Sequence, residues 1–440
     1  MTSGYPQDTT PHQSSRMKAP SNYCLRQGSG MLDDIWNTPE VMRNLLNQSL
    51  QDNGGIDLPG LSEKLEGNSI FAGKSPLEVM AECRPDKDGS FNNKITIIGC
   101  GTSWHVALLA EYLIESIARV PVEVFYASEY RYKAPLHNKG DVLIAVSSSG
   151  ETSDTLESVK NVKRVCSDVL TIAAVNEAGT PVAVECDAAL IAQAGKEHGI
   201  ASTKVFSNSV LGFALLAIAV GDACGTIPQA EREKLISSLR ELPDIVQQVL
   251  DKEAKAIRPG AQKSTLAIGD CQLWDIGCQN VLANNFIFLG RGFNFPVALE
   301  GAMKCKEVAY IHAEGYPAAE MKHGPIALID QFMPVVCICP KSDPTYDKIK
   351  ANVEETKARN GAVIVVTEED NNELEEICEF VIKVPRTHEY FMPLVVVIPL
   401  QLLATMMGML RGNEVDNPRG LEKTVSVKTV PGISRSATPE

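Results

Sequence analysis

The feature that most constrains the fold is a strand followed by a glycine turn, which occurs twice. Residues 95–98, with the sequence Ile-Thr-Ile-Ile, are mainly apolar and run into the turn Gly99-Cys-Gly-Thr-Ser103. Residues 287–292, with the sequence Ile-Phe-Leu-Gly-Arg-Gly, repeat the strand and the turn. A short apolar run that ends in glycines and leads into a helical pattern is typical of a strand–loop–helix unit. We therefore predict an internal duplication of one α/β domain, each copy a parallel sheet flanked by helices.

The remaining elements follow from the spacing of apolar residues. Further strands are predicted at residues 122–126, 141–146, 334–338 and 363–366, and helices at residues 106–118, 211–220, 346–357 and 389–411. The charged stretch 228–253 is expected to be helical between its prolines. Cys337 and Cys339 lie in an apolar run, where a buried strand is favoured over a metal site because no CxxC pair or histidine accompanies them. His312 lies in an apolar run and is expected to be packed.

These patterns divide the chain into six parts. We predict a disordered leader at 1–30, a helical linker segment at 31–66, a first domain at 67–226, a connector with an insertion at 227–284, a second domain at 285–410, and a C-terminal tail with an extension at 411–440. The leader is rich in Ser, Thr, Pro and Gln and has few large apolar residues.

Composition indicates a globular protein and excludes several classes of partner. The 440 residues are 44% hydrophobic and 22% charged, and the net charge of −14 argues against binding to nucleic acid or to an anionic membrane. No apolar run is judged long enough for a membrane helix, and no signal peptide is recognised, so a cytoplasmic protein is expected. The twelve cysteines, mostly isolated in apolar segments, indicate reduced thiols. No metal or organic cofactor is implied.

One predicted helix carries two different faces. Its small apolar face is formed by Ala298, Ala302, Cys305 and Ala309. A second stripe, formed by Glu300, Lys304 and Glu307, projects carboxylate, ammonium and carboxylate groups together. A carboxylate that takes a proton from carbon, with an ammonium close enough to tune it, is an array suited to acid/base chemistry. Spacing alone favours a surface stripe of ion pairs, because such pairs are common.

Two loops rich in small hydroxyl residues follow predicted strands of the first domain. They are Gly99-Cys-Gly-Thr-Ser103 and Ser147-Ser-Ser-Gly-Glu-Thr152, and each leads into a helix. Hydroxyl and backbone N–H groups at a helix N-terminus suit a phosphate group. The alternative is that the hydroxyls only cap their helices. Neither a full dinucleotide fingerprint nor a P-loop is present.

Segments 298–307, 310–314 and 320–330 resemble the second sugar-isomerase (SIS) domain of the glucosamine-6-phosphate synthase family, also called glutamine–fructose-6-phosphate aminotransferases. The resemblance covers roughly residues 31–427. It implies two tandem SIS domains with flavodoxin-like, doubly wound sheets. It also implies an aldose–ketose isomerase that converts fructose 6-phosphate to glucosamine 6-phosphate for UDP-N-acetylglucosamine biosynthesis.

The resemblance also implies residue roles. Glu307 would carry the proton between C1 and C2 with the help of Lys304, and Glu300 would orient the array. His323 would open the sugar ring from the other subunit of a homodimer, and Lys423 would form a Schiff base with the open-chain ketose.

The resemblance further implies which residues hold the sugar phosphate. They are Cys100, Gly101, Thr102, Ser103, Ser147, Ser148, Ser149, Thr152 and Ser202. Several positions depart from the family pattern, and three of them bear on the site. Ser148 replaces a glutamine, Lys196 replaces a proline, and Glu422 lies beside Lys423, where it would favour the charged ammonium.

Several functions stay open. The family's glutaminase begins with a cysteine, whereas this chain begins Met1-Thr-Ser, so we expect ammonia to come free or from a separate glutaminase partner. An amino-sugar-phosphate deaminase or deglycase would use the same residues in reverse. A sugar-phosphate sensor without turnover is a third possibility. The chain could also be a piece of a longer synthase.

Overall fold

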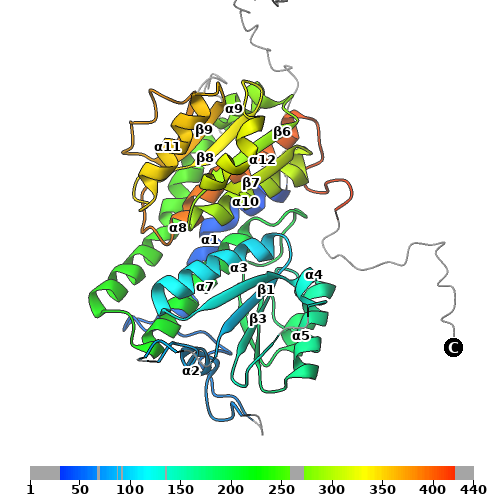
Figure 1. The fold of residues 1–440 in the computed structure, drawn as a ribbon, viewed down its shortest axis with the longest axis vertical. Coiled ribbons are helices and arrows are strands. Elements are labelled where there is room, and N and C mark those ends of the chain that lie inside the picture. Colours follow the sequence, from blue (N-terminus) through cyan, green and yellow to red (C-terminus); the bar gives the residue numbers. More distant parts are fainter. Residues whose placement is uncertain are drawn as a thin grey trace, which may run out of the picture.

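The computed structural model describes residues 30–66, 70–86, 88–90, 93–133, 136–257 and 272–421. Two five-stranded sheets, each flanked by helices, lie one beyond the other along the long axis of the molecule (Figure 1). Every strand pairs with its neighbours in parallel. The predicted fold, an α/β duplication with two parallel sheets, is confirmed.

The first sheet has the strand order β2-β1-β3-β4-β5. Its strands are β1 (Ile95–Gly99), β2 (Val122–Tyr126), β3 (Val142–Ser147), β4 (Leu170–Val175) and β5 (Ala188–Ile191). Strands β1, β3 and β4 are buried along their whole length, as expected for apolar strands covered by helices on both faces. The order reverses between β1 and β3, which is where open α/β sheets bind ligands.

The second sheet repeats this order as β7-β6-β8-β9-β10. Its strands are β6 (Asn285–Gly290), β7 (His312–Pro317), β8 (Pro334–Ile338), β9 (Ala362–Glu368) and β10 (Phe380–Val384). Cys337 and Cys339 are fully buried in and directly after β8, as predicted. His312, which we expected to be packed, instead begins β7 with its side chain 70% exposed. That prediction was wrong because a strand, not a helix, follows Tyr310.

Helices cover both sheets. Around the first sheet lie α2 (Pro76–Ala81), α3 (Thr102–Leu113), α4 (Ala127–Tyr130), α5 (Ser153–Val165), α6 (Pro181–Glu185) and α7 (Lys204–Cys224). Around the second lie α9 (Gln272–Asn280), α10 (Asn294–Lys304), α11 (Tyr346–Lys357), α12 (Met392–Leu410) and the 3₁₀ turns η3 (Ala318–His323) and η4 (Pro325–Leu328).

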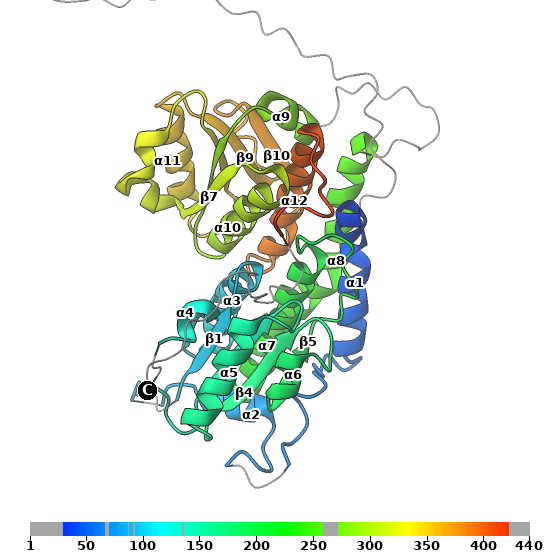
Figure 2. The ribbon, with the colours of Figure 1, turned by 90° about the vertical axis from the view of Figure 1, so that its right-hand side faces the viewer.

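Two further helices, α1 (Gly30–Ser49) and α8 (Gln229–Ile257), pack against each other along one side of the molecule (Figure 2). We expected α8 to be bounded by prolines, but it continues through Pro243. A proline in a surface helix costs one backbone hydrogen bond, and the packing of the buried face of α8 offsets this cost.

A pair of π-helical turns supports the duplication in detail. Helix α3 continues into η1 (Ile114–Ala118), and α10 continues into η2 (Cys305–Ala309). The residue after each π-turn has a left-handed backbone, Arg119 with φ 59° and Tyr310 with φ 53°. Each then leads to the edge strand next to the first strand of its sheet. The two halves therefore share a local irregularity, which independent folds would not be expected to have.

The interior is built on two apolar helices. Helices α7 and α12 are long and apolar enough to cross a membrane, so the prediction that no run has that length was wrong for them. In both, however, 89% of the apolar window is buried inside the protein. They are core helices, and sequence hydropathy alone does not separate such helices from membrane spans.

We predict opposite effects for two glycine-to-alanine substitutions. A Cβ on Gly290 would lie 2.1 Å from the carbonyl oxygen of Asn294, so Gly290→Ala should destabilise the protein by about 1–3 kcal/mol. A Cβ on Gly212, in the middle of α7, would meet only Leu190 atoms at 3.7–3.9 Å. Gly212→Ala should therefore stabilise the protein by roughly 0.5–1 kcal/mol through helix propensity. Urea unfolding of both variants measures the difference, and a loss of stability in both would contradict it.

Candidate active site at the junction of the two domains

A buried ammonium lies between two carboxylates on one helix. The Lys304 Nζ is 3.2 Å from Glu300 Oε1 and 2.5 Å from Glu307 Oε2. The side chains of Lys304 and Glu300 are fully buried, and that of Glu307 is 21% exposed. The predicted charged stripe therefore exists, and the alternative of a surface row of ion pairs is wrong. Of the three groups, only Glu307 can be reached from solvent.

The first domain completes this cluster. Thr102, in the first turn of α3, donates to Glu300 Oε1 at 3.2 Å and accepts from the Lys304 ammonium at 3.3 Å. His105, one turn later, contacts the other Glu300 oxygen through Nδ1 at 2.7 Å. Helices α3 and α10 pack directly against each other. The charged cluster therefore joins the two domains.

The cluster holds its charges firmly. Burial works to lower the pKa of Lys304, but the neighbouring carboxylates of Glu300 and Glu307 outweigh it and raise that pKa well above its ordinary value. Burial works to raise the pKa of Glu300, yet Lys304 and His105 together bring it below 4.5. Lys304 is thus a fixed cation at neutral pH. It would stabilise negative charge nearby without giving up its proton readily.

The two hydroxyl loops meet at the edge of the first sheet where the strand order reverses. The Ser148 N–H donates to Ser103 Oγ at 3.3 Å, which joins the loop after β3 to the loop after β1. Ser147 Oγ lies 2.9 Å from Thr152 Oγ1 and accepts the N–H of Gly150. In the described structure neither α3 nor α5 has a side-chain N-cap, so the capping alternative is wrong. The hydroxyls instead form hydrogen bonds within and between the loops. Their remaining hydrogen-bonding capacity suits an anion.

The other predicted phosphate residues are arranged differently. Gly101 is the N-cap position of α3, and Thr102 directs its hydroxyl to the charged cluster rather than to the loops. Cys100 is half-buried against the outer face of the first sheet. Ser149 accepts the N–H of Glu151. Ser202 lies in a third loop and is 3.4 Å from the carboxylate of Glu197.

Two predicted catalytic residues are not part of the described cluster. His323 ends η3 with an exposed side chain, and no hydrogen bond or ion pair joins it to Lys304 or Glu307 within the described ranges. Lys423 lies outside the described residues. The chain leading to it packs on the π-turn, because Asn413 donates to the Val308 carbonyl and the Arg419 N–H donates to the Tyr310 hydroxyl.

Three residues of this region carried no sequence prediction. His105 contacts Glu300, Glu197 accepts the Thr203 and Val205 N–H groups, and Asp34 binds the same loop from α1. His105 could have been recognised, since it lies three positions after Thr102 on one face of α3. Asp34 acts across more than 160 residues, which spacing does not reveal, whereas Glu197 acts within its own loop, where no regular period marks it.

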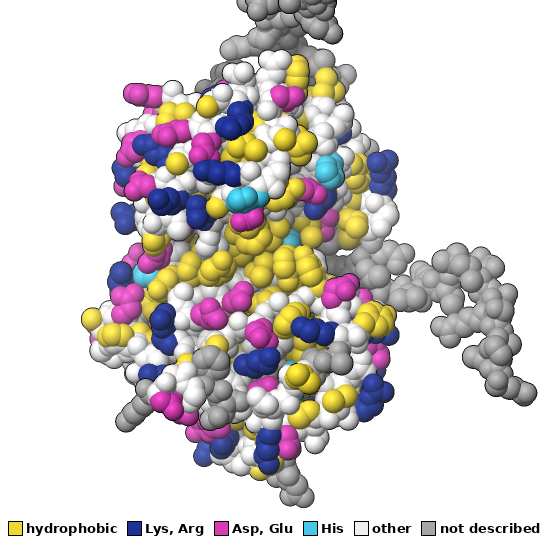
Figure 3. Space-filling model, in the orientation of Figure 1, with side chains coloured by type: hydrophobic (Ala, Val, Ile, Leu, Met, Phe, Trp, Pro, Cys, Tyr) yellow, Lys and Arg dark blue, Asp and Glu magenta, His cyan; other side chains and the backbone are white. Residues whose placement is uncertain are grey.

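Hydrophobic side chains gather on the surface across the junction of the two domains (Figure 3). In the first domain, Trp104 stacks on Tyr126 with ring centroids 4.0 Å apart, and Tyr126 is 44% exposed. On the second domain, Leu328 and Phe332 are 57% and 77% exposed and follow His323. Exposed apolar groups of this kind favour protein–protein contact.

Comparison with known proteins bears on this site. The SIS domain family matches residues 91–219 and 282–411. A glutamine–fructose-6-phosphate aminotransferase (isomerizing) of Chlorobaculum tepidum is 42% identical over 90% of this chain and 58% of its own length. The enzyme of the same name from Bacteroides thetaiotaomicron is 39% identical over 90% of this chain and 63% of its own length. The chain thus spans about three fifths of these relatives.

Solved structures of similar fold include proteins of this kind. The C-terminal domain of glucosamine-fructose-6-phosphate aminotransferase from Francisella tularensis superposes with a TM-score of 0.74 at 31% identity, covering 88% of this chain and 98% of that one. A glucosamine-6-phosphate deaminase from Thermotoga maritima, with a TM-score of 0.63 at 20% identity, covers 90% of this chain and 99% of its own and shares the fold.

We predict that the buried cation stabilises the junction. Lys304→Met leaves Glu300 buried without its counter-charge and should cost about 3–5 kcal/mol at pH 7. Because the pKa of Glu300 is lowered in the folded protein, its ionised carboxylate stabilises the fold above pH 4.5. This stabilisation is lost as the pH falls through the lowered pKa. Without Lys304 this carboxyl protonates more easily, so the deficit of the variant should shrink at pH 4.

Urea unfolding at both pH values measures the deficit, with Lys306→Met, an exposed neighbour, as the matched control. Equal stability of both variants at pH 7 would contradict the prediction.

Proposed function

Because the chain belongs to the SIS family, we propose that it is a sugar-phosphate isomerase that converts fructose 6-phosphate and ammonia to glucosamine 6-phosphate. The observation that carries this proposal is the position of Glu307. Its carboxylate is partly exposed and pairs with Lys304, while Lys304 and Glu300 are fully buried. Thr102 bonds to both buried groups, and the next residue, Ser103, accepts the N–H of Ser148 in the second hydroxyl loop. A phosphate anchor and a proton-transfer group are thus supplied by two adjoining domains.

The anchoring step uses the first domain. The phosphate group would bind the hydroxyls and N–H groups of Ser103, Ser147, Ser149 and Thr152, with Ser202 on the neighbouring loop. Ser148 offers a shorter polar group than the amide usual in the family, so this contact is expected to be weaker. When the phosphate is held at one end of the sugar, C1 and C2 at the other end are placed at the second domain.

The chemical step uses the second domain and the tail. Lys423 would form a Schiff base with the open-chain ketose after His323 has opened the ring. Ammonia replaces the lysine at C2, and Glu307 then moves a proton from C1 to C2. The fixed charge of Lys304 would stabilise the negative charge that develops on the sugar, and Glu300 keeps Lys304 in place.

The partners follow from the same assignment. The nitrogen would come from free ammonia or from a separate glutaminase. The exposed side chains of Leu328 and Phe332, which follow His323 in the sequence, support a homodimer in which this histidine serves the partner's site. The acidic charge and the buried apolar helices support a cytoplasmic enzyme that binds neither nucleic acid nor membrane.

We expect purified protein to form glucosamine 6-phosphate from fructose 6-phosphate and ammonium. Glu307→Gln should reduce this rate at least about 100-fold, because the amide does not accept the C1 proton. The exposed Glu320→Gln is the matched control and should act like the wild type. Faster release of ammonia from glucosamine 6-phosphate would favour the deaminase, which the change at Ser148 keeps open. Binding of either sugar without turnover would favour the sensor.

The shared histidine predicts complementation. His323→Asn and Glu307→Gln should each be inactive alone, but a mixed dimer would contain one site with neither change. Unfolding and refolding an equal mixture should therefore recover about a quarter of the wild-type activity, since half the dimers are mixed and each has one intact site. If His323 served its own subunit, every site would carry one change, and no activity would return.

A further inference from the structure

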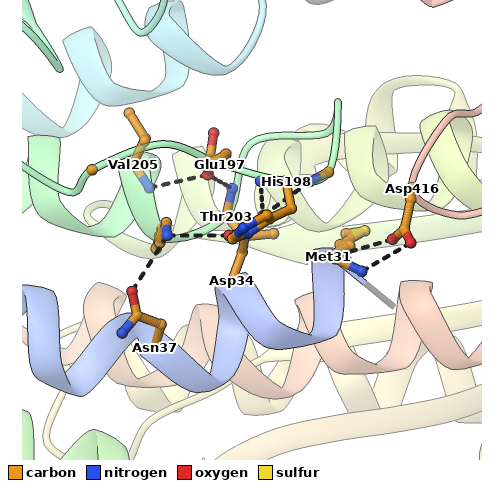
Figure 4. A network of polar contacts seen from close by, with 12 residues as sticks. Met31, Asp34, Asn37, Glu197, His198, Thr203, Val205 and Asp416 are labelled. Atoms are coloured by element: carbon orange, nitrogen blue, oxygen red, sulfur yellow. Dashed lines mark hydrogen bonds and ion pairs between the residues drawn. The ribbon is translucent and has the colours of Figure 1, made fainter. Parts of the chain in front are cut away.

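Helix α1 reaches into the loop that carries Ser202. Asp34, on its second turn, is 99% buried (Figure 4). Its carboxylate accepts the N–H groups of His198 at 2.7 Å and Gly199 at 3.0 Å. The same carboxylate forms an ion pair with Lys204 at 3.1 Å, whose side chain is only 6% exposed. One side chain thus binds both ends of the loop.

A second carboxylate, that of Glu197, binds backbone N–H groups within the same loop. Glu197 accepts the N–H groups of Thr203 at 2.6 Å and Val205 at 3.1 Å, and so caps the N-terminus of α7 (Figure 4). Burial is the main cause that raises the pKa of Glu197, and the nearby charge of Lys304 opposes it. The loop therefore lies within electrostatic reach of the charged cluster, although no hydrogen bond connects Asp34 itself to that cluster.

Helix α1 is fixed at its own start by the C-terminal segment. The two oxygens of Asp416 accept the N–H groups of Gly30 at 2.8 Å and Met31 at 2.9 Å (Figure 4). The Asp416 carbonyl also accepts the N–H of Ile200, in the Ser202 loop. A carboxylate on a helix N-terminus is favoured by the free N–H groups and by the helix dipole. The anchor of Asp34 is therefore itself held in place.

We propose that Asp34 is a positioning residue, which holds the loop from Glu197 to Lys204 in the position that allows Ser202 to bind the sugar phosphate. This inference rests on the proposed function for its substrate. Helix α1 is accordingly part of the binding site rather than only a connection to it. The ionisable groups that face Asp34 are Lys204 and His198, and Glu197 lies further along in the same loop.

The reason is geometric. One oxygen of Asp34 accepts the His198 and Gly199 N–H groups, and the other faces Lys204 and the His198 ring. Asparagine has no charge for Lys204 and only one acceptor oxygen, so it can hold the backbone N–H groups or face Lys204 but not both, and the loop loses its common anchor. Glu300, Lys304 and Glu307 keep all their contacts, because none of them is bonded to Asp34. Substrate binding should therefore weaken while the chemical step is preserved.

The test separates KM from kcat. Asp34→Asn should raise the KM for fructose 6-phosphate about tenfold, with kcat changed less than about twofold. Asp33→Asn, on the exposed side of the same turn, is the matched control and should change neither. Lys204→Met removes one partner of Asp34 but leaves the backbone contacts, so it should raise KM by a smaller factor. A fall in kcat at constant KM would overturn the proposal.

Hydrogen exchange gives a second readout that does not depend on turnover. In Asp34→Asn the amides of residues 198–203 should exchange at least about tenfold faster, while those in the middle of α1 and α7 keep the wild-type rate. Uniform acceleration through both helices, or no change in the loop, would mean that Asp34 only stabilises the fold. If the wild type binds neither fructose 6-phosphate nor glucosamine 6-phosphate in titration calorimetry, the proposed function fails, and the exchange data still decide whether Asp34 orders the loop.

Discussion

The buried ammonium of Lys304 is the interaction on which the rest of the site depends. Removing an ammonium from water costs several kcal/mol, and only close carboxylates offset this cost. Glu300 and Glu307 do so from the same helix, but Glu300 has a second oxygen that also needs a partner. That partner, His105, belongs to the first domain. The hydrogen bonding of Glu300 is therefore complete only when the two domains are packed together, so the junction and the candidate site depend on the same contacts.

The duplication explains how one geometry came to hold different groups. Both copies have a helix that widens into a π-turn and ends in a left-handed residue. In the first copy the third residue of the turn is Ser116, whereas in the second it is Glu307. A π-turn shifts the following side chains around the helix axis and is frequent at functional sites. Lys304 and Glu307 are three positions apart, a spacing at which side chains are neighbours on a helix, and they form a short ion pair.

Much of the fold could be predicted from sequence, but little of what joins its parts. Strands β2 and β8 and helix α11 match their predicted ranges because each has a simple apolar period between turn signals. The π-turns could not be predicted, since a change from 3.6 to about 4.4 residues per turn over five residues leaves almost no trace in the pattern. The charged stripe was recognised, yet its burial depends on His105, a residue distant in sequence. The packing predicted for His312 failed because an edge strand starts there.

Helix α1 and the described segment after α12 help to set the distance between the two halves of the site. The hydroxyl loops belong to one sheet and the charged helix to another, so their separation depends on whatever spans both domains. Helices α1, α8 and α12 do this, since each contacts the other two. Asp416 then ties the start of α1 to the segment that packs over Tyr310 beside the π-turn. A segment that looks like a linker in sequence is thereby bonded to the tail, to the Ser202 loop and to the core. These bonds limit how far the two domains can move apart, and they keep the anchoring loops at a fixed distance from Glu307.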